Sequence, residues 1–278
     1  MKKLSPMLWM TAGFMYIFMY APILIVVIFS FNDAKYGGPW RGFTLDWYRH
    51  LLDSETKIQA AENTLILAAV STLISTLLGT MLGYGLSRFK FPGKKLFAFL
   101  MYIPVVIPDI VMAVSLALFF QLLRKAVGPF LASAFSADPF LLGMNTMVMA
   151  HVTFQIPFVA IVVRSRLAGM DPAIEEAAHD LGAGSWQTFR YVTLPMILPG
   201  ILAGAILAFT LSLDDFVVSF FTTGPGATTL PILIYSSVKR GITPDINALS
   251  TLIVVASIVG TVAATMLQRP QQQEGKGT

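Results

Sequence analysis

Six long apolar runs constrain the fold of this chain more than any other feature of its sequence. They cover residues 8–31, 64–86, 96–123, 140–163, 196–221 and 246–267. A transmembrane helix needs about 20 predominantly apolar residues, and each run meets that length. Only 12% of the 278 residues are charged, and the mean hydropathy is +0.71, whereas soluble domains carry roughly 25% charged residues. The sequence therefore predicts an all-α integral membrane protein with six transmembrane helices in a single domain, 1–278.

The basic residues predict how these helices are oriented. The short connection between the second and third runs contains four of them: Arg88, Lys90, Lys94 and Lys95. Basic loops stay in the cytoplasm, so this connection, the segment 164–195 and both termini are predicted to be cytoplasmic. Positive-inside bias also explains the net charge of +4, so no nucleic acid is predicted as a partner. The first run is too long for the apolar part of a signal peptide, and it is interpreted as an uncleaved helix.

Helix breakers and small residues mark several of the predicted spans. Pro104, Pro108, Pro157 and Pro199 lie within them, and such prolines are tolerated where the freed carbonyls are buried or face a wet cavity. Small residues also recur at helical spacing, which allows helix backbones to approach closely. These rows are Gly79 with Gly83, Gly200 with Gly204, and Ala256 with Gly260 and Ala264. They predict close packing within the chain or, less strongly, against a second chain.

The connection 164–195 contains the signals of two short helices. Asp171 is predicted to cap the first, Pro172 suits its first position, and Gly182 suits its end. Ser185 is predicted to cap a second helix that ends before Pro195. A helix–turn–helix on the membrane surface is interpreted as a docking element.

The same connection resembles the EAA loop of permease subunits in binding-protein-dependent ABC importers. The resemblance lies in Glu176-Ala177-Ala178, in Gly182 and in Val192-Thr193-Leu194-Pro195, with Val192 in place of the usual isoleucine. In that family the loop is the coupling helix, which docks into a cleft of a cytoplasmic ATPase. The resemblance implies an ATPase-coupling role for six residues: Glu176, Ala177, Ala178, Gly182, Leu194 and Pro195.

Further segments resemble the spermidine/putrescine permease subunits, most of all the second permease of putrescine systems. They include Phe29-Ser30-Phe31-Asn32, Trp47-Tyr48, Pro108-Asp109-Ile110-Val111 and Pro244-Asp245-Ile246. The resemblance implies a type I ABC importer permease that moves putrescine or spermidine by alternating access in the bacterial cytoplasmic membrane. It also implies three partners: a second permease, an ATPase dimer and an external substrate-binding protein. No phosphate-binding Gly-x-x-x-x-Gly-Lys-Ser/Thr motif occurs, so ATP and Mg are expected on the ATPase, and this chain is not expected to be an enzyme.

Three acids lie within the predicted spans and favour a small cationic substrate. Asp109, Asp214 and Asp215 are there, although an aspartate at the bilayer centre costs roughly 2.5–3.5 kcal/mol. Asp109 either caps a helix that continues from Ile110 or lines the substrate pathway. Asp214 and Asp215 point about 100° apart on a continuous helix. Asp215, on the small and polar face, is the preferred pathway residue, whereas Asp214 is expected to pair within the protein.

Other polar and aromatic residues within the spans are weaker candidates for the pathway. His151 and Gln155 share one helix face, which favours interhelical hydrogen bonds over contact with substrate. Tyr102 and Phe154 either pack or stack on substrate amines. No metal site is predicted, because the other histidines lie in loops on opposite sides. The segment 224–231 is predicted to be an ordered external turn that meets a binding protein or has no such role. Importers of iron(III) or an organophosphonate, and secondary transporters, are the alternatives.

Overall fold

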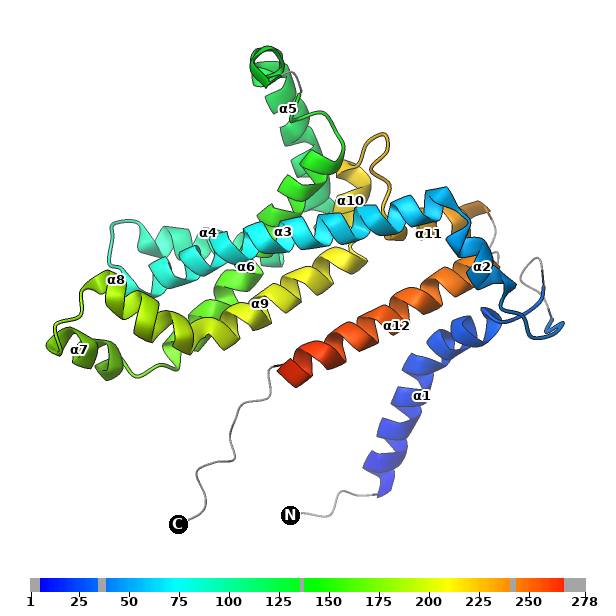
Figure 1. The fold of residues 1–278 in the computed structure, drawn as a ribbon, viewed down its shortest axis with the longest axis horizontal. Coiled ribbons are helices and arrows are strands. Elements are labelled where there is room, and N and C mark those ends of the chain that lie inside the picture. The colour runs from blue at the N-terminus through cyan, green and yellow to red at the C-terminus, as the bar shows by residue number, and fades with distance from the viewer. Residues whose placement is uncertain (1–5, 35–38, 136–137, 241–243, 268–278) are drawn as a thin grey trace. The chain divides into compact units, whose positions relative to one another are not determined.

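The computed structural model describes residues 6–34, 39–135, 138–240 and 244–267 (Figure 1). In these ranges the regular structure is helical apart from a single β-bridge between Asn32 and Phe43. The helices are α1 (Pro6–Phe29), α2 (Asp46–Leu52), α3 (Glu55–Arg88), α4 (Lys94–Val106), α5 (Asp109–Phe135), α6 (Met144–Ala168), α7 (Ala173–Asp180), α8 (Ser185–Thr188), the π-helical turn η1 (Phe189–Thr193), α9 (Leu194–Asp214), α10 (Val217–Thr222), α11 (Leu230–Arg240) and α12 (Pro244–Leu267).

The chain forms two compact units, one from residues 1–59 and 233–278 and the other from residues 60–232. In the first unit, α12 packs against α1 and α2. Asn32 organises the connection between α1 and α2, because its carbonyl accepts the Trp47 indole N–H at 2.9 Å and its side chain accepts the Arg41 amide at 2.8 Å. An ion pair of 2.6 Å between Lys57 and Asp245 links the first turn of α3 to α12. Two segments that resemble the polyamine permeases, around Asn32 and Trp47, therefore fold onto each other.

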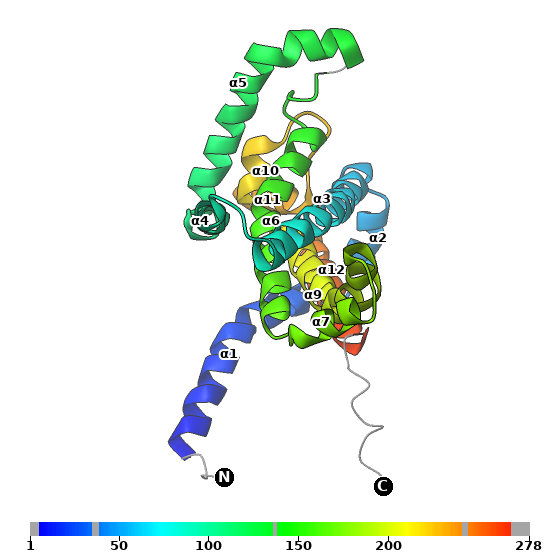
Figure 2. The same ribbon diagram turned by 90° about the vertical axis from the view of Figure 1, so that its left-hand side faces the viewer.

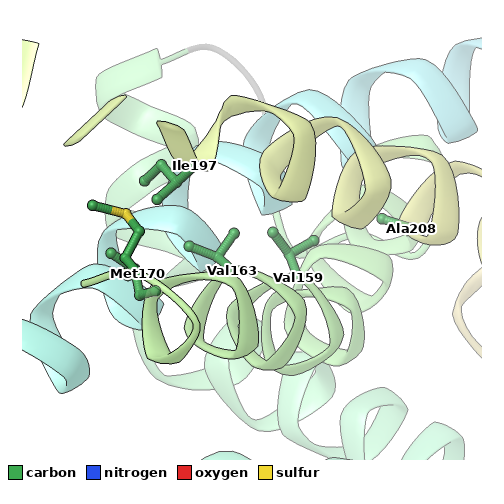
Figure 3. Packing of buried hydrophobic residues seen from close by; sticks show 6 residues of the cluster. Val159, Val163, Met170, Ile197 and Ala208 are labelled. Atoms are coloured by element: carbon green, nitrogen blue, oxygen red, sulfur yellow. The ribbon is translucent and has the colours of Figure 1, made fainter. Parts of the chain in front are cut away.

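In the second unit, α6 is the central helix and α9 lies along it (Figure 1). Val159, Val163 and Ile197 are fully buried between these helices, as Figure 3 shows. Glycines allow the close approach: a Cβ on Gly79 would lie 2.7 Å from that of Val159, and one on Gly204 would lie 3.2 Å from a Val159 methyl. The prediction of close packing within the chain is confirmed for the glycine rows of α3 and α9. Of the third row, the surroundings of Gly260 and Ala264 are outside what the structure describes.

Among the described residues, five helices are long and apolar enough to cross a membrane. They are Met7–Phe29, Glu55–Arg88, Asp109–Phe130, Met144–Ala168 and Ser185–Asp214. The sixth predicted span, 246–267, falls on α12, whose described apolar part is the shorter stretch Pro244–Ala256. The all-helical fold class is confirmed. That these helices form one domain, 1–278, stays a prediction.

Two predicted spans are not continuous helices. The third, 96–123, breaks between α4 and α5, where the chain turns sharply at Ile107 and Pro108 (Figure 2). Ile107 is extended, with φ −66° and ψ 134°, because the residue before a proline is pushed out of the helical region. The fifth, 196–221, ends as α9 at Asp214; Asp215 is extended, with φ −65° and ψ 120°, before α10 begins. The expectation of one unbroken helix through both aspartates was wrong.

Candidate functional sites: a coupling helix and an acidic pocket

The predicted docking helix is α7, and its two ends form as local rules require. At its start, the Asp171 carboxylate accepts the Ala173 amide N–H at 3.0 Å. Pro172, predicted as the first helical residue, takes the cap position instead, so the helix begins one residue later than predicted. At its end, Gly182 adopts a left-handed φ of 86°. Its amide bonds to the carbonyl of His179 at 2.9 Å, and the Ala183 amide bonds to that of Ala178 at 3.0 Å. This pair of bonds is the Schellman motif, so the predicted stop at Gly182 is confirmed.

The second short helix differs from its prediction at both ends. Gly184, rather than Ser185, takes the cap position, and its amide donates to the Gln187 side chain at 2.9 Å. Helical structure then continues through Pro195 instead of ending before it, by way of the π-helical turn η1 into α9. A proline ring collides with the carbonyl four residues earlier and offers no amide hydrogen. A widened turn of the π type relieves that conflict at the start of α9.

The two adjacent glutamates of α7 lie in different surroundings. Glu175 is held inside the chain: its carboxylate accepts the Thr193 hydroxyl at 2.7 Å and lies 3.0 Å from Arg88 Nε of α3. Glu176 is exposed, as is Ala177 beside it, whereas Ala178 is partly buried. Leu181, at the end of α7, is 89% exposed. The helix therefore presents Glu176, Ala177 and Leu181 outward, while Glu175 ties it to α3 and to η1. Sequence reasoning did not anticipate the tie through Arg88 and Thr193.

A second candidate site is a pocket of about 350 Å³ that combines carboxylates and phenylalanine rings. Four helices and the break between α9 and α10 form it. Its lining includes all three acids predicted within the spans and contains neither lysine nor arginine. The lining residues are Asp109, Met112, Phe154, Phe158, Leu211, Asp214, Asp215, Phe216, Val217 and Val218.

Asp215 is the acid of this pocket that the protein itself engages most. Its carboxylate accepts the backbone amides of Val218 at 3.3 Å and Ser219 at 2.8 Å, which caps α10. It also lies 3.3 Å from His151 Nε2. The side chain is 12% exposed. Asp215 therefore holds the start of α10 in place against α6, because a capping carboxylate satisfies amides that the helix leaves free.

Asp109 and Asp214 are the exposed acids of the pocket. Neither forms an ion pair with another residue in the described part of the chain. Asp109 is the first residue of α5 rather than the cap that precedes it. Asp214 was expected to pair within the protein, but Asp215 is the acid that pairs, with His151, whereas Asp214 is exposed. Which of the two lines the substrate pathway stays a prediction. Their spacing on an ideal helix does not apply, because the helix breaks at Asp215.

The buried polar pair of α6 makes the interhelical hydrogen bonds expected of it. His151 bonds through its two ring nitrogens to the hydroxyls of Ser212 at 2.8 Å and Ser219 at 3.0 Å. Gln155 donates to Ser71 and to the Ala208 carbonyl, both at 3.2 Å. Both side chains are fully buried. His151 and Gln155 thus join α6 to α3, α9 and α10.

Of the two aromatic residues predicted as pathway candidates, one lines the pocket and the other does not. Phe154 lines the pocket and its ring lies 5.2 Å from that of His151. Tyr102 is exposed on α4 and is not part of the lining. Phe158 and Phe216 were not anticipated, although Phe158 lies four residues after Phe154 and so shares its helix face. The described residues contain no group of three or more His, Cys, Asp or Glu arranged to hold a metal ion.

The turn after α10 is ordered, as predicted. Asn63 donates to the carbonyls of Gly226 and Thr228, both at 3.0 Å, and Thr64 accepts the Leu230 amide at 2.8 Å. Gly226 has a φ of 76°, a conformation that glycine adopts without strain. These bonds attach the turn to α3. Whether it meets a binding protein stays a prediction.

The comparisons with known proteins agree with this architecture. The chain belongs to the family described as the binding-protein-dependent transport system inner membrane component, which matches residues 75–273. The putrescine transport system permease protein PotI of Escherichia coli strain K12 is 45% identical over 258 residues, covering 92% of this chain and 89% of that protein. The spermidine/putrescine transport system permease protein PotC of the same strain is 38% identical over 268 residues, covering 95% and 96%.

Solved structures show the same fold at low sequence identity. A bacterial ABC transporter involved in the import of the acidic polysaccharide alginate matches with a TM-score of 0.73 at 22% identity, over 96% of this chain and 95% of that one. The chain is therefore a multi-pass inner-membrane permease subunit with the type I ABC importer fold, and its relatives are transport subunits rather than enzymes. Because the alginate transporter shares the fold, the fold alone does not determine the charge of the cargo.

Proposed function

We propose that this permease subunit translocates protonated polyamines, putrescine or spermidine, and that the acidic pocket lies on their route. The observation that supports this cargo most is the lining: three carboxylates and three phenylalanines without a lysine or arginine. The relatives named for putrescine and spermidine transport support the same assignment. The alkylammonium groups of polyamines resemble the lysine side chain, so they are charged near neutral pH.

Asp109 and Asp214 are the acids that meet the cargo in this proposal. Both are exposed at the pocket, so each is free to approach an ammonium group. A carboxylate about 4 Å from an amine gains on the order of 4 kcal/mol at an effective dielectric of 20, before desolvation is subtracted. Phe154, Phe158 and Phe216 add faces for cation–π contact, worth roughly 0.5–2 kcal/mol each. Asp215 and His151 hold the pocket wall in shape.

The transport cycle in this proposal depends on partner chains. A second permease completes the pathway, an external binding protein delivers the polyamine, and a cytoplasmic ATPase dimer binds ATP and Mg. Both termini and the coupling segment 164–195 lie in the cytoplasm. The exposed face of α7 docks on the ATPase, and closure of the ATPases moves α7. Glu175 transmits that movement to α3 through Arg88 and to η1, which leads into α9, through Thr193, and the pathway opens outward.

The cargo is tested by energised uptake in bacteria that lack this chain. Labelled putrescine and spermidine are supplied to such cells with and without a restored wild-type copy, and an uncharged diol of matching length is the competitor control. We expect uptake of at least one polyamine to return, with unlabelled polyamine competing and the diol failing to compete. Unchanged uptake of both, with the chain present in the membrane, would contradict the proposed cargo.

A further inference from the structure

A second pocket, lined by positive charge, lies away from the acidic one. Its volume is about 520 Å³, within the range of roughly 300–1,000 Å³ that small-molecule sites occupy. It is formed by the turn after α3, the first turns of α4 and the late part of α6. The lining residues are Lys90, Phe91, Gly93, Lys94, Lys95, Ala98 and Arg164.

The charge of this pocket is not balanced from within the described chain. Four of the lining residues are cations and none is an acid. Lys94 donates to the Phe89 carbonyl at 3.0 Å, but within the described residues Lys90, Lys95 and Arg164 form no ion pair. Arg88 nearby is instead paired with Glu175. Four like charges around one cavity repel one another, and an anion in the cavity removes that cost.

The start of α4 adds to the positive field. Gly93 is the residue before this helix and has a φ of 81°, and no side chain caps the helix. The amide of Lys94, the first of the helix, donates to the Phe91 carbonyl at 3.3 Å. The helix dipole places partial positive charge at this end. Backbone amides and lysines at one helix start make a phosphate-binding arrangement.

Apolar surface adjoins the same pocket. Leu96 is 58% exposed, Phe97 53% and Phe99 66%. In a chain that spans a bilayer, side chains of this kind contact hydrocarbon, whereas charged side chains at helix ends lie among the headgroups. The pocket is thus at the membrane interface, with cations at the headgroup level and lipid-facing side chains next to them.

We propose that this pocket binds the headgroup of an anionic phospholipid. The phosphate is recognised by Lys90, Lys94, Lys95 and Arg164 together with the positive end of the α4 dipole, while the acyl chains lie along the exposed apolar face of that helix. Basic pockets between transmembrane helices are sites of this chemistry. The lipid would hold α4 against the end of α6, the helix that leads into the coupling segment 164–195. The inference depends on the chain spanning a membrane and not on the identity of its cargo.

Native mass spectrometry of the assembled, detergent-purified importer tests the site. Phosphatidylglycerol and phosphatidylcholine with the same acyl chains are titrated into complexes that contain wild-type chain, the variant Lys90→Gln/Arg164→Gln or the control Lys125→Gln. Lys125 is an exposed cation on α5 outside the pocket. Inorganic phosphate is added in a separate arm, because a site for a free anion would use the same groups.

We expect tight retention of phosphatidylglycerol over phosphatidylcholine by the wild type and the control. The double variant should bind phosphatidylglycerol about thirtyfold more weakly, since each cation near a headgroup contributes about a fivefold change in affinity. Equal retention of the two lipids, or an unaffected double variant, would overturn the proposal. So would displacement of the lipid by inorganic phosphate, or binding that appears only after the ATPase is removed, which would identify the pocket as a site for a free anion or for the ATPase.

Discussion

In the coupling segment the residues that determine the geometry are close in sequence, whereas in the acidic pocket they come from four helices. Asp171, Gly182 and Ala183 define α7 through bonds that reach at most five residues along the chain. The state of Asp215 depends instead on His151, which is far away in sequence on α6. The geometry of the coupling helix is thus determined locally, whereas the acidic pocket forms only when the helices pack. Substitutions in the two regions should consequently have different effects on uptake, stability and ATPase binding.

The largest effect is expected for removal of both exposed acids of the pocket. Asp109→Asn/Asp214→Asn preserves shape but deletes two charges that would meet the cargo. A hydrogen bond to a charged group contributes about 1.5–3 kcal/mol, so polyamine uptake at low concentration should fall roughly a hundredfold, measured with labelled putrescine in cells that lack the native chain. Asp46→Asn, at an exposed position of α2, is the control.

If the Asp109→Asn/Asp214→Asn variant showed normal uptake at normal membrane abundance, the cargo would not pass through this pocket. A loss that higher polyamine concentration overcomes would instead support direct contact. The concentration dependence of uptake therefore distinguishes weaker binding from a damaged fold.

Asp215→Ala should mainly lower stability. It removes the cap of α10 and leaves His151 without its carboxylate, and losses of this kind cost about 2 kcal/mol. The thermal midpoint of the purified assembly should drop, whereas Asp214→Ala should leave it unchanged. If Asp214→Ala were the more destabilising of the two, the assignment of structural and exposed roles would be wrong.

Gly182→Ala tests the locally determined end of α7. A Cβ at a φ of 86° costs roughly 1–2 kcal/mol for a residue other than glycine. Gly184→Ala is the matched control, since its φ is −69°. We expect weaker association of the ATPase with the Gly182 variant alone, measured by co-purification. Equal loss in both variants would show that small size, and not the left-handed turn, is what matters.

The smallest effect is expected from the two neighbouring glutamates of α7. Glu175→Gln weakens the links to Arg88 and Thr193, and a partly exposed ion pair contributes about 1 kcal/mol or less. Transport per ATP hydrolysed should fall a fewfold while the ATPase remains bound. Glu176→Gln, at the exposed position, should weaken ATPase binding instead. Identical behaviour of the two variants would contradict a division between inward and outward roles.

Sequence reasoning succeeded where short-range chemistry decides the outcome. The apolar runs predicted the helical membrane fold, and Asp171 with Gly182 predicted the bounds of α7 to within one residue. The second short helix, which starts at Ser185, was expected to stop before Pro195. Instead, the π-helical turn η1 accommodates the proline without a break in the helix. That adjustment answers the ring of Pro195 within the helix itself, a response that capping signals in the sequence do not describe.

The pocket shows the opposite case. Its three acids were all singled out, but the roles of Asp214 and Asp215 were assigned from their positions on an ideal helix. The break at Asp215 depends on a tertiary partner, His151, and on the free amides of Val218 and Ser219. No periodicity in residues 196–221 reports such a break, because its stabilisation comes from another helix. Which of Asp214 and Asp215 is held by other residues of the chain was therefore evident only from the structure.

The most direct test of the account measures putrescine uptake and ATP hydrolysis together in proteoliposomes that contain the complete importer and its binding protein. We expect Asp214→Asn to raise the putrescine concentration needed for half-maximal uptake roughly tenfold while ATP hydrolysis by the saturated complex stays unchanged. Glu176→Gln should lower uptake and hydrolysis together without changing that concentration. Parallel loss of both activities in Asp214→Asn, with no change in concentration dependence, would contradict the assignment of cargo contact to the acidic pocket.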